Sequence, residues 1–155
     1  KKIKTLEDKL RILSGLYGLL RPLDAIRPYR LEMGTSLSFD TDKNLYSFWK
    51  TKITDQLNAE LKEGELLVNL ASKEYFSAID SKSIKSSIVT PQFKDFKNGK
   101  LKIISFFAKI ARGMMVRYLI DKDASSINEI LGFNFDGYNF SKSETQDELN
   151  PVFIR

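Results

Sequence analysis

Residues 13–34 constrain the fold of this chain more than any other stretch, because glycines and prolines recur there at short intervals. Both prolines follow an arginine, at Arg21-Pro22 and Arg27-Pro28. A residue before proline is pushed away from helical backbone angles, so both arginines are expected at bends. An arginine at a rigid bend loses less freedom on binding and can grip a phosphate or carboxylate with two hydrogen bonds. The stretch predicts an anion-binding bend, and a turn with solvated arginines is the alternative.

A helix and a tight turn are predicted just before this bend. Leucines at helical spacing predict a helix over residues 5–14. Gly15 and Gly18 then interrupt it, and glycines let backbone N–H groups approach a phosphate. The run Gly15-Leu16-Tyr17-Gly18 is therefore a candidate hairpin of a helix-hairpin-helix element, and a simple bend or packing contact is the alternative.

A long amphipathic helix is predicted between Asp42, as its N-cap, and Gly64, which ends it. Its apolar side chains recur at helical spacing, and we expect this stripe to lie in the core. The stripe consists of Leu45, Phe48, Trp49, Ile53, Leu57 and Leu61.

Polar side chains gather around the next predicted junction. Residues 65–71 predict a buried strand, and Ser72 predicts the N-cap of a short helix with Glu74 in its first turn. A strand end and a helix N-terminus, where sites lie in α/β-type folds, would then bring together Asn69, Ser72, Glu74 and Tyr75. Simple helix capping is the alternative.

The second half of the chain predicts a hairpin followed by a helix. Residues 87–93 and 100–106 predict strands, and Asn98-Gly99 between them is a strong hairpin signal. A helix is expected over residues 107–121. Its apolar stripe is expected at Phe107, Ile110, Ala111, Met114 and Tyr118. Lys109 and Arg112 share one of its faces, and they form a second basic cluster together with Lys100, Lys102 and Arg117.

Shorter elements complete the chain. Ser126 and Glu129 have the spacing of a capping box that opens a short helix. Strands are expected at residues 138–140 and 151–154, with a polar loop between them. The sum predicts an α+β fold: a mixed sheet with a hairpin packed by several helices, and a helix-hairpin-helix-like element near the N-terminus.

Composition limits the chemistry that this chain can perform. Its 155 residues suit a single domain, and its net charge of +5 permits an anionic partner without requiring one. Cysteine and histidine are both absent, which excludes a thiol peroxidase, an iron–sulfur cluster, a histidine-ligated haem and a di-iron centre of the Glu-x-x-His kind within this segment. We therefore expect no metal site and no cofactor. No apolar run approaches about 18 residues, so we expect no membrane span and, by default, a cytoplasmic protein.

Several motifs together resemble one known family. Residues 13–24 (LSGLYGLLRPLD) and 28–34 (PYRLEMG) resemble the central motif of the YaaA family of bacterial peroxide stress proteins. Further stretches that resemble it, in order, are 69–76 (NLASKEYF), 98–112 (NGKLKIISFFAKIAR), 132–140 (GFNFDGYNF) and 152–153.

The resemblance implies a cytoplasmic protein that protects against peroxide by limiting iron-dependent damage. It also implies double-stranded DNA binding through a helix-hairpin-helix, here without sequence preference, because backbone phosphates would be the target. Family members carry a further N-terminal portion, so residues 1–155 would be one domain that forms the later part of a longer protein. The candidate anion-binding residues are Gly15, Gly18, Arg21, Arg27, Arg30, Lys109 and Arg112.

Two other functions stay open at the level of sequence. An enzyme acting on an anionic small molecule would need a pocket built from Tyr17, Tyr29, Glu32, Asn69, Ser72 and Glu74 together with the basic residues. Iron binding by carboxylates alone, with ligands such as Glu60 and Glu63, is the least favoured. The first two functions share one expectation, that the two basic clusters meet in space.

Overall fold

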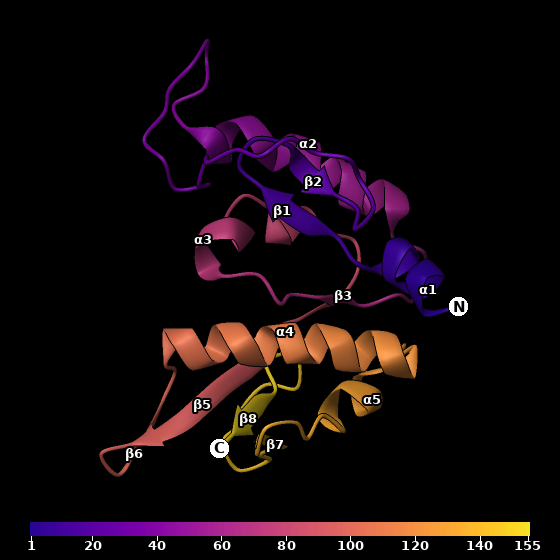
Figure 1. Cartoon of the computed structure of the whole chain (residues 1–155), viewed down its shortest axis with the longest axis vertical. Helices are drawn as coiled ribbons and strands as arrows, with labels where there is room; N and C mark the ends of the chain where they lie inside the picture. The colour runs from indigo at the N-terminus through magenta and orange to yellow at the C-terminus, as the bar shows by residue number, and fades with distance from the viewer. The chain divides into compact units, whose positions relative to one another are not determined.

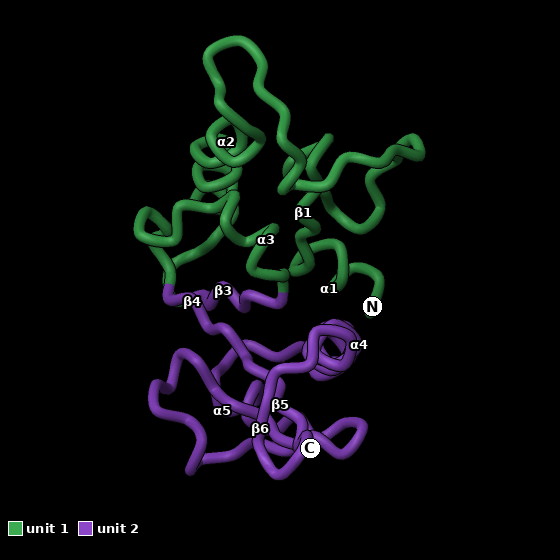
Figure 2. The backbone as a smooth tube through the Cα atoms, turned by 90° about the vertical axis from the view of Figure 1, so that its left-hand side faces the viewer, with its two compact units in different colours: residues 1–64, 71–86 green, residues 65–70, 87–155 purple.

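The computed structural model describes residues 1–155, and the chain divides into two compact units (Figure 2). Unit 1 contains residues 1–64 and 71–86, and unit 2 contains residues 65–70 and 87–155. Helices combine with small parallel, antiparallel and mixed sheets, which confirms the α+β class (Figure 1). The expectation of one domain over residues 1–155 stays a prediction. No helix is long and apolar enough to cross a membrane.

Unit 1 begins with a helix and a β-hairpin, not with a helix-hairpin-helix. Its elements are α1 (Lys2–Lys9), β1 (Ile12–Ser14), β2 (Gly18–Leu20), α2 (Leu45–Glu60), α3 (Lys73–Phe76) and a 3-10 turn, η1 (Ser81–Ser83). The expected helix over residues 5–14 therefore starts earlier and ends at Lys9, and the expected hairpin is flanked by two antiparallel strands. The structure does not confirm the predicted helix-hairpin-helix.

The turn of this hairpin requires a glycine at position 18. Ser14 pairs with Gly18 across a three-residue loop, a length that needs a left-handed residue after the turn. Gly18 supplies it with a φ of +76°. The Ser14 hydroxyl also accepts the backbone N–H of Tyr17 at 3.0 Å, which closes the loop.

Helix α2 forms as predicted, with a shifted start. Its N-cap is Asn44, two residues after the expected Asp42, and Asn44 and Ser47 form a reciprocal capping box. Leu45, Ile53 and Leu57 of the predicted stripe are buried. Trp49 is only half-buried. The short helix α3 starts after Ser72, whose side chain accepts the backbone N–H of Tyr75, so the predicted N-cap is confirmed.

Unit 2 is built on a four-stranded mixed sheet with strand order β6-β5-β8-β7. Its elements are β3 (Leu67–Val68), β4 (Ile88–Val89), β5 (Gln92–Lys97), β6 (Lys100–Lys102), α4 (Ser105–Lys122), α5 (Ile127–Leu131), β7 (Asn139–Phe140) and β8 (Val152–Ile154). Strands β5 and β8 are parallel, whereas β6 and β7 run antiparallel to their neighbours. Strands β3 and β4 form a separate parallel pair.

The local signals of unit 2 are confirmed. Asn98 and Gly99 both have positive φ, as a two-residue turn between β5 and β6 requires. Ser126 and Glu129 form the capping box of α5. The predicted stripe of α4 is partly wrong, because Phe107 and Ile110 are 37% and 44% exposed.

Helix α4 packs on β5 through a set of side chains that only partly matches the predicted stripe. Ala108, Ala111, Met115 and Tyr118 are its buried residues, and they join a core of aromatic rings. Phe93 lies at the centre of that core and contacts the rings of Phe133, Tyr138 and Phe153. Small alanines bring the helix close to the sheet, which explains why the face with bulkier Phe107 and Ile110 is turned outward.

Candidate functional site

The open end of the hairpin places two arginines beside one glutamate. Because Ile12 pairs with Leu20, Arg11 and Arg21 leave the hairpin next to each other. Both reach Glu60 in the last turn of α2. The Nε atom of Arg11 lies 2.5 Å from Glu60 Oε2, and an Nη atom of Arg21 lies 3.5 Å from Glu60 Oε1.

Arg11 has a structural role, because its guanidinium is already bonded within the protein. Its side chain is only 16% exposed, and its guanidinium also donates to the backbone carbonyls of Glu7 and Leu10 at the end of α1. It therefore satisfies acceptors that a helix C-terminus leaves unpaired. Arg21 is 50% exposed and holds only the longer contact, so its guanidinium has donors to spare.

Glu60 stays ionised at this site. Burial alone would raise the pKa of its carboxyl, but hydrogen bonds from Gln56 and Arg11 and the charges of Arg11 and Arg21 outweigh burial and lower the pKa. The Gln56 amide donates to Glu60 Oε1 at 2.5 Å. Glu60, which the sequence offered as a metal ligand, is thus occupied by protein donors.

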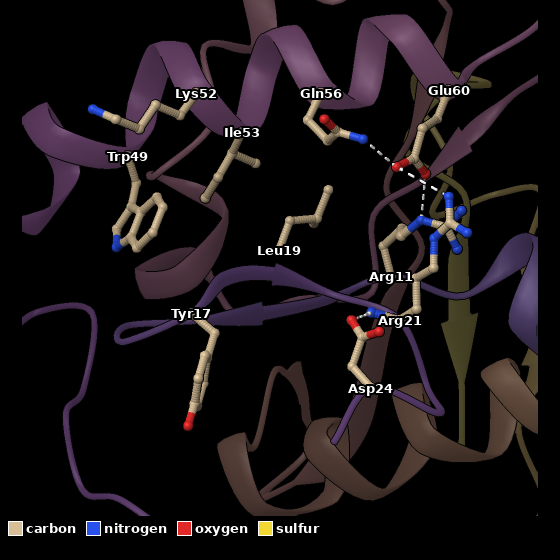
Figure 3. A pocket seen from close by; sticks show the side chains of 10 residues that line it. All are labelled: Arg11, Tyr17, Leu19, Arg21, Asp24, Trp49, Lys52, Ile53, Gln56 and Glu60. Atoms are coloured by element: carbon tan, nitrogen blue, oxygen red, sulfur yellow. Dashed lines mark hydrogen bonds and ion pairs between the residues drawn. The ribbon is translucent and has the colours of Figure 1, made fainter. Parts of the chain in front are cut away.

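A groove of about 540 Å³ extends from this charged cluster along α2 (Figure 3). Leu19 of β2 and Ile53 of α2 face each other in it, and Trp49 lies at the end away from the arginines (Figure 3). The groove is lined by Arg11, Tyr17, Leu19, Arg21, Asp24, Trp49, Lys52, Ile53, Gln56 and Glu60. Every one of these residues belongs to unit 1.

The two hairpin glycines fix the Trp49 end of the groove. A Cβ on Gly18 would come within 2.5 Å of the Trp49 ring, so only glycine allows the indole to lie there. The indole N–H donates to the Gly15 carbonyl at 2.9 Å. The backbone of Gly15 in turn packs so closely on the Leu31 carbonyl that a side chain would overlap it.

Residues 21–30, which we call the arginine loop, follow the hairpin and are anchored along their length. Asp24 accepts the backbone N–H of Arg21 at 2.8 Å, and the Tyr17 hydroxyl accepts that of Arg27 at 3.1 Å. Tyr29 hydrogen-bonds the buried hydroxyl of Ser14 and packs edge-on against Tyr17, with ring centroids 5.4 Å apart. The backbone of the loop is thus held by the hairpin.

The side chains of Arg27 and Arg30, in contrast, are not bonded to the rest of the protein. Both residues are exposed, and neither guanidinium forms a hydrogen bond or ion pair with the protein. Two full positive charges therefore project from an anchored backbone. Binding an anion there costs less ordering entropy than binding it on a free chain.

The structure brings most of the predicted pocket residues together in unit 1. Glu74 accepts the backbone N–H of Gly34 at 2.9 Å, which ties α3 to the end of the arginine-rich motif. The phenol of Tyr75 has a raised pKa, because it is partly buried and lies near the charges of Glu74 and Glu32. Three further predicted pocket residues already have partners. Tyr17 accepts from the arginine loop, Tyr29 hydrogen-bonds the hairpin, and Ser72 caps α3.

Three of the predicted site residues lie in unit 2. Asn69 follows β3, and its amide donates to the Thr90 hydroxyl. Lys109 is exposed on α4. Arg112, one turn along, donates to the Ala108 carbonyl, and burial lowers the pKa of its guanidinium. The meeting of Lys109 and Arg112 with the arginine loop stays a prediction.

The sequence reasoning missed the α2 side of the groove. Trp49, Ile53, Gln56 and Glu60 are spaced i, i+4, i+7 and i+11, so they share one helix face. That spacing is visible in the sequence, but only the hairpin packed against α2 makes the face a groove.

The sequence of this chain is similar to those of several known proteins. Residues 1–144 match the family described as peroxide stress protein YaaA. The UPF0246 protein of Flavobacterium johnsoniae is 61% identical over 154 residues, which cover 99% of this chain and 61% of that protein. Its counterpart in Flavobacterium psychrophilum is 61% identical over 139 residues, covering 90% of this chain and 55% of that protein.

A relative of lower identity belongs to the same group of UPF0246 proteins. The UPF0246 protein of a Marinomonas species is 53% identical over 153 residues, covering 99% of this chain and 58% of that protein. The chain thus spans about three fifths of the length of these curated relatives.

Proposed function

Because the chain belongs to the peroxide stress protein YaaA family, we propose that it protects cytoplasmic DNA against peroxide by limiting iron-dependent damage. In this proposal it binds double-stranded DNA through backbone phosphates and without sequence preference. The observation that supports DNA binding is the anchored arginine loop, in which the exposed side chains of Arg27 and Arg30 have no partner in the protein.

Arginine suits this role physically. A guanidinium can donate two parallel hydrogen bonds to one phosphate, and neither its charge nor its geometry depends on the base sequence. Arg21 adds donors at the start of the loop, because its contact with Glu60 is long. Lys109 adds a further exposed positive charge on α4.

A salt titration of duplex binding tests the proposal. Each phosphate that a protein neutralises contributes about −0.9 to the slope of log K against log salt. The five candidate side chains are those of Arg21, Arg27, Arg30, Lys109 and Arg112, for which we expect a slope of roughly −2 to −5. Arg27→Ala and Arg30→Ala should each weaken binding to all duplex sequences alike and reduce the size of the slope by about one.

Lys4→Ala is the matched control for charge. Lys4 is 80% exposed and paired with Asp8 on α1, so its removal lowers the net charge by the same unit without touching the arginine loop. Fluorescence anisotropy of a labelled duplex measures each affinity, and circular dichroism checks that each variant is folded. Equal losses for Lys4→Ala and Arg30→Ala, or no loss for folded Arg30→Ala, would overturn the role of the loop.

A survival assay tests the protective role separately. Cells that lack their own copy would receive the wild-type gene or the Arg27→Ala/Arg30→Ala variant and then be exposed to peroxide. We expect only the wild type to restore survival if DNA binding protects. Full protection by a variant that no longer binds DNA would separate peroxide protection from the arginine loop.

A further inference from the structure

The groove between the hairpin and α2 has a length and a polarity that suit a small elongated ligand. Trp49 and Glu60 are eleven residues apart on one helix, which corresponds to about 16 Å along the axis. The volume of about 540 Å³ is that of typical small-molecule sites, which span about 300 to 1,000 Å³. Apolar Leu19 and Ile53 lie between an aromatic end and a charged end (Figure 3).

The aromatic end is preformed. The Trp49 indole is fixed by its hydrogen bond to the Gly15 carbonyl and by its close packing on Gly18. The ring of Phe48 lies 4.7 Å from it, edge to face. A rigid, half-buried indole offers a planar ligand a stacking surface that does not have to be ordered on binding.

The charged end has donors left over. Two guanidinium groups face the carboxylate of Glu60, to which Arg11 and Gln56 already donate at 2.5 Å each. The carboxylate of Asp24 is used by the backbone N–H of Arg21. The half-exposed guanidinium of Arg21 therefore holds the free donors at this end, and it is the group that an incoming anion would meet.

We propose that this groove binds a mononucleotide, with the base against Trp49 and the phosphate at Arg21. A free nucleotide and a single nucleotide unit of a DNA strand share this chemistry. The site shares Arg21 with the arginine loop but differs from duplex binding in its use of Trp49 and the groove, because phosphates of a duplex need neither a stacking surface nor a groove.

Trp49 provides a direct assay because it is the only tryptophan in the chain. Adenosine monophosphate titrated into the 155-residue chain should change the tryptophan fluorescence and saturate. Adenosine lacks the anion and inorganic phosphate lacks the ring, so each should bind about tenfold more weakly or worse. A short single-stranded oligodeoxyadenylate distinguishes the two sources: tighter binding than the monophosphate assigns the site to a DNA strand, and weaker binding assigns it to a free nucleotide.

Two charge variants test the geometry. Arg21→Gln should weaken binding of the monophosphate about tenfold or more, because it removes the charged donor, and Arg21→Lys should recover part of that loss. Lys50→Gln is the matched control, because Lys50 is exposed on α2 next to Trp49 and does not line the groove. Its effect should be less than about twofold. Circular dichroism confirms that each variant is folded.

Three results would overturn the proposal. The first is the lack of a saturable fluorescence change with millimolar monophosphate. The second is equal affinity for inorganic phosphate and for the monophosphate, which would reduce the site to a simple anion contact. The third is an equal loss in Arg21→Gln and Lys50→Gln, which would mean that net charge and not the groove governs binding.

Discussion

Gly18 must be glycine for two reasons, its backbone angle and its contact with Trp49, whereas Gly64 must be glycine only for its backbone angle. Both have strongly positive φ, +76° and +80°. A Cβ on Gly18 would also collide with the Trp49 ring, but a Cβ on Gly64 would meet nothing within 4 Å. The pair therefore separates backbone strain from steric overlap in the same protein.

We expect Gly18→Ala to destabilise the fold more than Gly64→Ala. A left-handed backbone costs a residue with a Cβ about 1–2 kcal/mol, and this is the whole expected cost at Gly64. At Gly18 the displacement of Trp49 adds about 1–3 kcal/mol. Urea unfolding followed by circular dichroism measures both. Equal costs would show that the indole moves aside freely and that the hairpin does not fix the end of the groove.

A buried tyrosine gives a second prediction for single residues. Tyr138 is fully buried and donates at 2.7 Å to Asp95, a carboxylate that is 5% exposed and also accepts from Arg155. Burial and the Asp95 charge raise the pKa of Tyr138, so the phenol keeps its proton as a donor. Tyr138→Phe should cost about 1.5–3 kcal/mol, the range for hydrogen bonds to charged groups.

Tyr118→Phe is its control. Tyr118 lies in the same core but donates to a neutral backbone carbonyl, that of Glu129, at 2.9 Å. Its loss should cost only about 0.5–1.5 kcal/mol. If unfolding experiments give Tyr118→Phe the greater cost, the Asp95 carboxylate is not the partner that makes Tyr138 important.

At the level of elements, the sequence predicts the features that depend on neighbouring residues and misses those that depend on contacts between distant residues. The caps at Ser72 and Ser126 and the turn at Asn98-Gly99 depend on residues at most three apart, so they were confirmed. The hairpin was mistaken for part of a helical motif because a short apolar run fits a strand and a helix equally well. Arg11 ends the helix before the hairpin, because it caps the C-terminus of α1. It also pairs with Glu60, which lies forty-nine positions away in the sequence.

The capping box of α5 should make part of the stability depend on pH. Backbone and side-chain hydrogen bonds from Ser125 and Ser126 lower the pKa of Glu129 below its ordinary value of 4.5. A lowered pKa in the folded state means that the ionised carboxylate favours folding. Its contribution is complete above pH 4.5 and is lost as the pH falls through the lower folded pKa.

Glu129→Gln measures this contribution. Glutamine can still fill the capping box but does not ionise. We therefore expect the wild type to be the more stable protein at neutral pH and the advantage to shrink as the pH falls below 4.5. Urea midpoints across a pH series provide the test. An advantage that persists unchanged into acid would mean that the charge of Glu129 has no role in the cap.

On the scale of the whole molecule, the chain passes from one unit to the other three times, after residues 64, 70 and 86. Residues 71–86 of unit 1 are therefore inserted between β3 and β4, which pair with each other in unit 2. Composition and periodicity do not record which segments share a core. Unit 1 in particular joins segments that lie far apart in the sequence.

This arrangement predicts that residues 1–64 do not fold alone, whereas residues 1–86 do fold. Buried Ala78, Ile79 and Ile84 come from the inserted segment, so a chain that ends at residue 64 loses part of its core. It also loses three hydrogen bonds to α2: the backbone N–H of Asp80 to Thr54, Asn58 to the Ser83 carbonyl, and the backbone N–H of Lys85 to Asn58. Thr54 is itself buried, and without this segment its hydroxyl would keep only its hydrogen bond to the Lys50 carbonyl.

The complementary segment should be less dependent on the rest of the chain. Residues 87–155 keep every fully buried member of the aromatic core of unit 2 and lose only β3 with the half-buried Leu66, Val68 and Leu70. Circular dichroism during urea titration should show a cooperative transition for residues 1–86 and for residues 87–155, but not for residues 1–64. A transition for residues 1–64 as sharp as that for residues 1–86 would mean that the hairpin and α2 form a stable core by themselves. The inserted segment would then be unnecessary for holding the groove and the arginine loop in place.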